Sequence, residues 1–240
     1  MRWVQASPAA FATPSEILIA LPWFVFPNGG LGDLAATAHR TGWAFLLALT
    51  IGSPFGFAVA KSRRFRVEGA FVLDFLRSIP ATALVPLFLV IFGLDDFSKI
   101  AVGAFSGSLA IAISIIIGFE SLNQERMRTA DRIHLRGLQR VFYYELPELT
   151  PSFFVGLRAA ASLCLILVIV AEMFIGSEDG LGKVIMDRRY SDNVPGLYAA
   201  IVISGLLGYL INLALAAVAG RISARMSGAR FGGTVATTGF

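Results

Sequence analysis

Cysteine and histidine are scarce in this chain, which holds one cysteine and two histidines in 240 residues. A single cysteine excludes an internal disulfide and a cysteine-based zinc site. The histidines, His39 and His134, lie far apart in the sequence, so a histidine-pair metal site is not expected either. Cys164 lies within an apolar run, where a buried thiol behaves as a small hydrophobic group. We therefore expect no metal and no cofactor bound by this chain itself.

Charge is also sparse. Charged residues make up 15% of the chain and apolar residues 56%, with a mean hydropathy of +0.72. A soluble domain of this size has too few charged side chains to cover so much apolar surface. The net charge of +4 does not indicate a nucleic-acid partner, because the basic residues cluster at the ends of apolar runs, as topology signals do. The composition predicts an all-α, polytopic helix bundle in a lipid membrane.

The apolar runs predict five spans. A hydrocarbon core of about 30 Å requires about 20 apolar residues in a helix. Runs of this kind occupy residues 41–60, 78–94 with the preceding 71–76, 100–119, 149–171 and 193–220. We expect residues 1–40 to be an external or interfacial segment, 41–222 the transmembrane domain and 223–240 a disordered tail. The first fifteen residues lack a sustained apolar core, so no cleavable signal is expected.

Basic residues predict the orientation of these spans. They follow the first span, fill the loop at 119–147 and follow the last span, at Lys61, Arg63, Arg64, Arg66, Arg126, Arg128, Arg132, Arg136, Arg140, Arg221, Arg225 and Arg230. The five-span count places all three regions on one side, which the positive-inside rule assigns to the cytoplasm. The chain is thus expected to be a multi-pass protein of the plasma (inner) membrane with a cytoplasmic C-terminus.

Short motifs in a specific order carry a family resemblance. Arg77-Ser78-Ile79-Pro80 precedes Leu84-Val85-Pro86-Leu87-Phe88, and Gly156-Leu157-Arg158 precedes Ala171-Glu172-Met173 and Gly180-Leu181-Gly182. This order resembles the permease subunits of ATP-binding-cassette importers, in the nitrate/sulfonate/taurine branch. Permeases of that branch usually have six spans. A first spanning helix, which usually precedes a stretch like residues 13–16, is missing here, so either the start codon lies further upstream or this member has five.

The resemblance implies a function and partners. The chain is expected to form the transmembrane path for a small solute, an anion such as a sulfonate, taurine or nitrate, and to have no enzymatic activity of its own. ATP and Mg would be bound by separate cytoplasmic ATPase subunits, and an external binding protein would deliver the solute. A second permease subunit completes the path, with a homodimer expected and a heterodimer as the alternative.

The basic loop at 119–147 is the expected docking site for the ATPase. The family signature there is E-A-A-x3-G-x9-I-x-L-P. Anchoring it at Leu146-Pro147 leaves Ala130 as a match and puts His134 at the glycine, whereas anchoring it at Gly137 puts Asp131 at the acidic position. Both registers are degenerate and stay open. Apolar residues at helical spacing in this loop, which include Leu138 and Phe142, favour a docking helix over a solvated basic connector.

Two further features are candidates for the solute path. Pro80 and Pro86 each remove a backbone donor within an apolar segment, so residues 78–86, from Ser78 onward, either line a pathway or form a packing kink. Glu172, near the outer end of a span, either pairs with a cation near the solute route or sits among headgroups and ends its helix. Arg158, which we place near the inner end of that span, is expected to reach the interface and serve structure alone.

Other classes of membrane protein stay open at this point. A secondary transporter or channel requires a coupling residue buried in the membrane, and Glu172 is the candidate in this sequence. A membrane scaffold that transports nothing is the other alternative.

Overall fold

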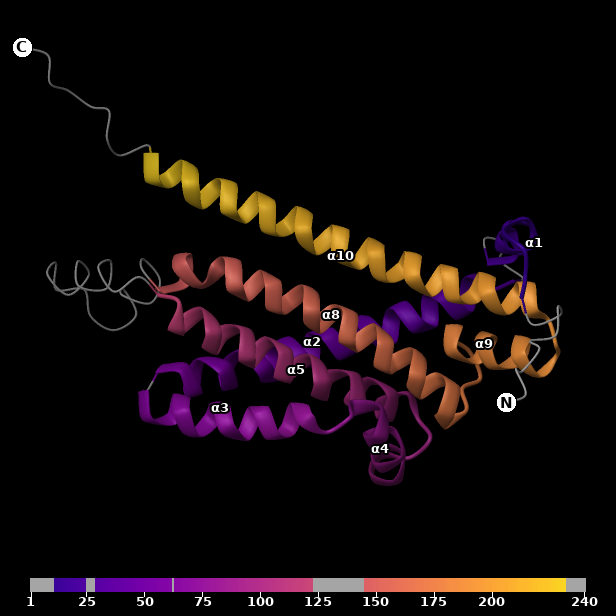
Figure 1. Cartoon of the computed structure of the whole chain (residues 1–240), viewed down its shortest axis with the longest axis horizontal. Coiled ribbons are helices and arrows are strands. Elements are labelled where there is room, and N and C mark those ends of the chain that lie inside the picture. The colour runs from indigo at the N-terminus through magenta and orange to yellow at the C-terminus, as the bar shows by residue number, and fades with distance from the viewer. Residues whose placement is uncertain (1–10, 25–28, 62, 123–144, 232–240) are drawn as a thin grey trace, which may run out of the picture.

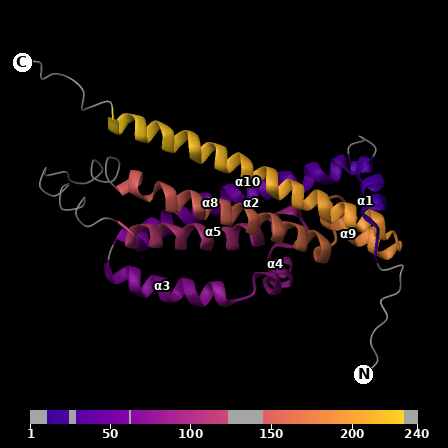
Figure 2. The same cartoon turned by 45° about the horizontal axis from the view of Figure 1, so that its top comes forward.

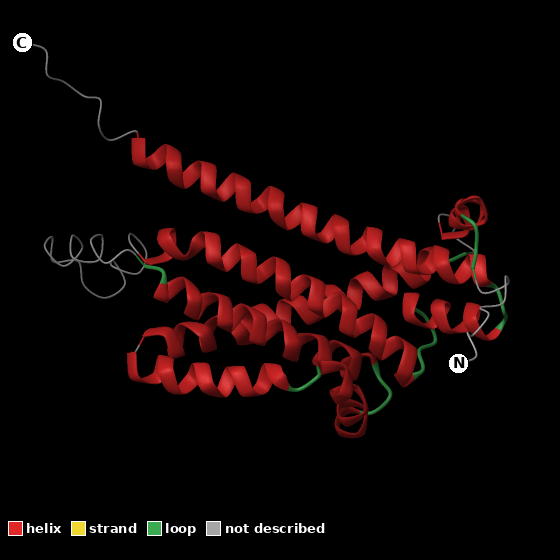
Figure 3. Ribbon diagram, in the orientation of Figure 1, coloured by secondary structure: helices red, strands yellow, loops and turns green. Residues whose placement is uncertain are grey.

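The computed structural model describes residues 11–24, 29–61, 63–122 and 145–231, and Figure 3 shows this part of the chain as helices joined by loops, with no strand. Figure 1 labels the α-helices, which are α1 Pro14–Ala20, α2 Leu31–Lys61, α3 Arg63–Ser78, α4 Val85–Phe92, α5 Asp96–Glu120, α8 Leu146–Ile175, α9 Leu181–Tyr190 and α10 Val194–Phe231. Two short 3₁₀ helices, η2 Leu21–Phe24 and η3 Ala81–Leu84, complete the described elements. The predicted all-α fold is confirmed.

Four of these helices are long and apolar enough to cross a membrane, namely α2, α5, α8 and α10. The predicted spans at 41–60, 100–119 and 149–171 fall within the first three, and the span at 193–220 starts one residue before α10. The predicted second span differs, because it is a pair of helical segments, Val67–Ser78 and Ala81–Phe92, bent by 75°. Pro80 explains the break: a proline cannot continue the hydrogen-bond ladder and disfavours helical geometry at Ile79 before it.

Two expected domain boundaries fall inside helices. α2 begins at Leu31 and includes residues 31–40. α10 continues past residue 223 to Phe231; residues 232–240 lie outside the described part. The external location of residues 1–40 stays a prediction. The N-terminal segment forms α1 and η2, too short to span, and α1 is fixed by a capping box between Thr13 and Glu16.

α2, α5 and α8 form the centre of the bundle, and glycines let them approach closely. A Cβ added at Gly52 of α2 would lie 2.5 Å from the carbonyl oxygen of Ser108 on α5. One added at Gly107 of α5 would lie 2.7 Å from the Sγ of Cys164 on α8. Small residues at such positions let helix backbones pack in contact. Cys164 is fully buried at this junction, as expected for a structural thiol.

The two ends of the bundle differ. One end, on the left of Figure 1, holds the α2–α3 turn, the end of α5, the start of α8 and the end of α10. Lys61, the last residue of α2, therefore lies at this end. The opposite end holds α1 and α9, and Figure 2 shows the same grouping from a second direction. α10 packs against α8 and α9, and Asn212 of α10 donates a hydrogen bond to the Ser162 hydroxyl, midway along α8, at 2.9 Å.

Candidate functional site: a buried charge cluster and a cavity at the broken span

Glu172 of α8 is buried in the structure, with 1% of its surface exposed. Its carboxylate accepts hydrogen bonds from Arg40 Nη1 of α2 at 2.9 Å and from Gly182 N of α9 at 2.9 Å. The Thr37 hydroxyl lies 3.0 and 2.9 Å from the two carboxylate oxygens and donates to them. These donors compensate for the loss of water around the charge, which would otherwise be costly.

Arg40 links this carboxylate to two more. Its Nε donates to Asp96 of α5 at 2.8 Å, and its Nη2 donates to the carboxylate of Asp179, in the connection between α8 and α9. Its Nη1 also donates to the Asp179 carbonyl at 3.0 Å. Lys99 adds a second cation, 3.2 Å from Asp96. One guanidinium with fixed donor directions therefore ties α2 to α5, to α8 and to the connection between α8 and α9.

The first amides of α9 are held by the same groups. Gly180 N donates to Asp33 at 2.8 Å and Leu181 N to the Thr37 hydroxyl at 2.8 Å, next to the bond from Gly182 to Glu172. The start of a helix leaves such amides without backbone partners, and here side chains of α2 and α8 satisfy them. Gly180 has a φ of 119°, and a Cβ there would lie 2.5 Å from the Glu172 carboxylate carbon. Only glycine fits at this position.

Glu172 lies in the last turn of α8, which ends at Ile175, and its side chain is buried against other helices. Its role at the solute route and its depth in the membrane stay predictions. Glu172 pairs with a cation, Arg40, so it is not available as a free coupling carboxylate. We did not anticipate Arg40, since we assigned residues 1–40 to an external segment. The sequence signal was an arginine three residues after Thr37, immediately before an uncharged apolar run.

The proline-containing candidates for the pathway lie at the bend of the second span. Ser78 ends α3 and its hydroxyl donates to the Asp74 carbonyl at 2.7 Å. Pro80 precedes η3, and Pro86 lies in the first turn of α4, where its missing N–H costs little. Glu172 is not part of this group.

A cavity of about 470 Å³ opens beside the bend, between the end of α3, η3, α5 and α8. Its volume is within the usual range for small-molecule sites. Its lining is mostly apolar, with Ser106 and Ser114 as hydroxyl groups and Arg77 as the charged residue; the other lining residues are Leu76, Ile79, Pro80, Ala81, Phe105, Leu109, Ala110, Ile113, Ala159 and Leu163.

Most of the expected docking residues lie outside the described residues; these are Ala130, Asp131, His134, Gly137, Leu138 and Phe142. Leu146 and Pro147 are described. They form the first turn of α8, at the end of the bundle opposite α9. The docking loop therefore stays a prediction, with only its C-terminal boundary visible as the start of a spanning helix.

Comparisons with known proteins agree with this architecture. The family model for the inner membrane component of binding-protein-dependent transport systems matches residues 48–228. The taurine transport system permease protein TauC of Escherichia coli is 26% identical over 222 residues, covering 90% of this chain and 80% of TauC. The nitrate import permease protein NrtB of Leptolyngbya laminosa is 26% identical over 195 residues, covering 81% of this chain and 70% of NrtB.

A solved structure shares the fold. In the inward-facing MetNI methionine ABC transporter, the similar chain superposes with a TM-score of 0.69 at 18% identity, covering 80% of this chain and 95% of that one. The family assignment rests on the family model, which covers most of the chain. The chain belongs to the family of binding-protein-dependent transport system inner membrane components, the permease subunits of ATP-binding-cassette importers.

Proposed function

We propose that this permease forms half of a transmembrane path for a small anion, of the sulfonate, taurine or nitrate kind. The relatives named for taurine and nitrate support this solute class. The single observation that carries a path through the bundle is the bend of 75° in the second span, with a cavity of about 470 Å³ beside it. Broken helices occur within membranes where the freed backbone groups face protein or a water-filled cavity.

The path requires partners. Two copies of this chain enclose it in our proposal, because one bundle with four or five spans cannot surround a solute, and symmetric pairs are the commonest assembly. ATPase subunits bind ATP and Mg and dock against the loop at 119–147, while a binding protein delivers solute at the end that carries α1 and α9. In this proposal the complex lies in the inner membrane, with the C-terminus of this chain in the cytoplasm.

Within this proposal the buried charge cluster has a mechanical role. Arg40 connects α2 with α5, α8 and the connection to α9, so these elements move as one unit when the ATPase drives a change of conformation. The bend at Pro80 separates α3 from α4, and each of these two helices packs on its own against that unit. Motion is then expected between the bent span and the central three helices.

The test is reconstitution of the complete complex. The chain would be co-expressed with an ATPase subunit and a binding protein from the same organism, and proteoliposomes would be assayed for uptake of labelled taurine, ethanesulfonate and nitrate. We expect uptake of at least one, dependent on ATP and on the binding protein. Uptake driven by an ion gradient without ATP would indicate a secondary transporter. Binding-protein-stimulated ATPase activity without uptake of any probe would refute the proposed solute class.

A further inference from the structure

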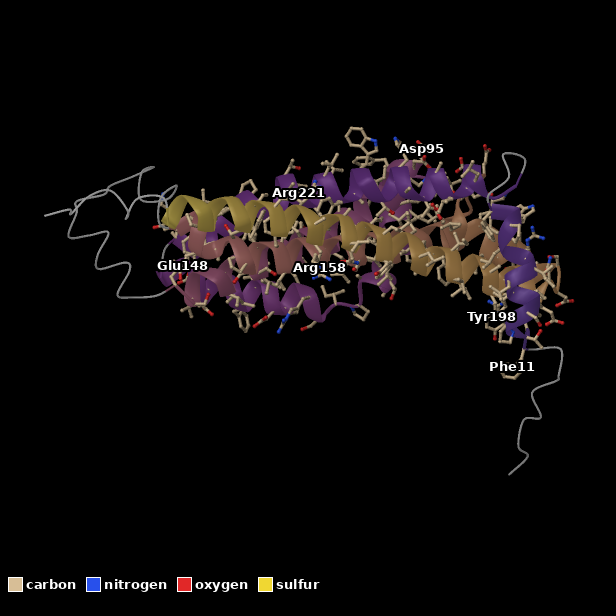
Figure 4. All side chains as sticks on the ribbon, turned by 90° about the horizontal axis from the view of Figure 1, so that it is seen from above. Phe11, Asp95, Glu148, Arg158, Tyr198 and Arg221 are labelled. Atoms are coloured by element: carbon tan, nitrogen blue, oxygen red, sulfur yellow. The ribbon has the colours of Figure 1, made fainter. Side chains whose placement is uncertain are left out.

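The cavity beside the bend of the second span lies between two groups of helices. One wall comes from the bent span, where Arg77 is the charged residue among the lining residues, and the other comes from α5 and α8. Ala159 lines it near the middle of α8. Figure 4 labels the preceding residue, Arg158, between Glu148 at one end of the bundle and Tyr198 at the other. The cavity therefore lies partway along the bundle and not at either end.

Ser106 of α5 carries a hydroxyl that has no partner, although the residue is buried. It is 7% exposed and lines the cavity, and its hydroxyl makes no hydrogen bond within the described part of the chain. On the same helix, the hydroxyls of Ser98, Ser108 and Ser121 each donate to a carbonyl three residues earlier, at 2.7 to 2.9 Å. Buried hydroxyls are normally paired, so that of Ser106 is available to a molecule in the cavity.

Access to this hydroxyl distinguishes Ser106 from other unpaired hydroxyls in the structure. The hydroxyl oxygens of Thr41 and Ser53 also lack a partner among the described residues, but the protein encloses them fully. The hydroxyl of Ser106 is not among these enclosed groups and keeps accessible surface. Because Ser106 lines the cavity, this surface faces the cavity.

Arg77 supplies the charge of the lining. Asp74, one turn earlier on α3, lies 3.0 Å from its Nε, and its two Nη groups have no partner among the described residues. Both side chains of this pair are more than half exposed, so the attraction between them is weak. The Nη groups of a guanidinium offer two parallel donors, which match the oxygens of a sulfonate, carboxylate or nitrate group.

We propose that this cavity binds the solute inside the permease, with Arg77 and Ser106 donating hydrogen bonds to its anionic group. The apolar remainder of the lining accommodates the hydrocarbon part of an organic anion. Arg77 belongs to the bent span and Ser106 to the central three helices, so a bound solute bridges the two parts between which motion is expected. This inference rests on the proposed function, and it assigns the solute's contacts to two residues.

The first experiment compares Ser106→Ala with Ser108→Ala in the complete complex, with the binding protein saturating. Both substitutions remove one hydroxyl from α5, but of the two residues only Ser106 lines the cavity. Uptake of the probe that the wild type imports should fall about tenfold in Ser106→Ala, the effect of losing one hydrogen bond to a charged group. Ser108→Ala should import at the wild-type rate. Unchanged uptake by Ser106→Ala, or an equal loss in the two variants, would overturn the inference.

A cysteine at residue 106 tests contact with an anion without relying on transport. Ser106→Cys in a Cys164→Ser background is treated with two methanethiosulfonates, one carrying a sulfonate and one a trimethylammonium group. The ratio of the anionic to the cationic reaction rate should fall about tenfold when Arg77→Gln is added, because the attraction of a nearby charge is lost. Arg77→Lys should preserve the ratio. Ser191→Cys, outside the cavity, is the control, and its ratio should not respond to Arg77→Gln.

An excess of the imported probe should also slow modification of Ser106→Cys with Arg77 intact, and this measurement decides the matter if Arg77→Gln does not assemble. A cysteine at residue 106 that is unreactive or unprotected by the probe, or a ratio indifferent to Arg77→Gln, would refute the site. Absence of uptake of every probe by the wild type would instead refute the proposed solute class. The dependence of cysteine modification on Arg77 would still decide whether the cavity attracts anions.

Discussion

Arg40 of α2 and Glu172 of α8 form a buried ion pair, with 2.9 Å between Nη1 and Oε1, although 132 residues separate them in the sequence. Each is at least 95% buried, and the pair is completed by Thr37 and by the amide of Gly182. Breaking such a pair leaves a charge without a partner and without water. The cluster is therefore the most sensitive structural point outside the solute path.

Replacement of Arg40 by alanine is expected to destabilise the protein by about 3–5 kcal/mol, because it leaves Glu172 buried and unpaired. The measurement is the midpoint temperature of thermal unfolding in detergent. Unfolding is monitored by the reaction of a thiol dye with Cys164, which is buried in the folded protein. The control, Lys183→Ala, removes a half-buried cation 3.7 Å from the exposed Asp187, and should cost at most about 1 kcal/mol. Equal effects of the two substitutions would show that the Arg40 cluster contributes no more than a surface pair.

Replacement of Gly180 by alanine is expected to detach the start of α9 from α8. The residue has a φ of 119°, and its added Cβ would lie 2.5 Å from Cδ of Glu172. Either the carboxylate or the loop must move, and the bond from Gly182 to Glu172 is lost. Limited proteolysis near residues 176–192 should become faster in Gly180→Ala. The same substitution at Gly205 of α10, which has open space around it, should leave the cleavage rate unchanged.

Close packing of α2 on α5 gives a third prediction. Gly56→Ala places a methyl group 2.9 Å from the Cα of Ala112, so the helices must separate, at a cost of about 1–3 kcal/mol. Gly42→Ala, on the same helix, meets nothing within 4 Å and should stabilise the protein by up to about 1 kcal/mol through helix propensity. The same thermal assay measures both. A stabilising Gly56→Ala would contradict the observed approach of the two helices.

Orientation in the membrane is testable with single cysteines in the Cys164→Ser background. Ser121→Cys, at the end of α5, should react with a membrane-impermeant maleimide only after the cytoplasm is opened. Ser191→Cys, just after α9, should react in intact spheroplasts. The reverse labelling would place the basic end of the bundle outside and remove the docking loop from the reach of the ATPase.

Coupling through the loop at 119–147 is the last prediction. Asp131→Lys, or Leu138→Ala combined with Phe142→Ala, should release the ATPase subunit or allow ATP hydrolysis without uptake, while membrane insertion is retained. Asp131→Glu, which keeps the acidic group, should behave as the wild type. Co-purification of the ATPase and the ratio of solute to ATP are the measurements. Normal transport by the altered loop would show it to be a solvated connector.

Much of the fold was predictable from local composition. The apolar runs at 100–119, 149–171 and 193–220 predicted α5, α8 and α10, because the hydrophobic length of a span depends on contiguous residues alone. The bend at Pro80 was visible as a proline within an apolar run, although the angle between the two segments depends on packing. The start of α2 at Leu31 was missed because Asp33, His39 and Arg40 interrupt its hydropathy.

What the sequence by itself determined is the class of this protein: a helical membrane bundle whose basic regions lie at one end, with motifs in the order of an importer permease. Only the tertiary structure decided how its few charges are used. It paired Arg40 with Glu172 across 132 residues and left Arg158 exposed and without a described counter-ion partway along α8. The physical reason is that hydropathy is summed along the chain, whereas the partner of a buried charge depends on which helix faces turn toward one another.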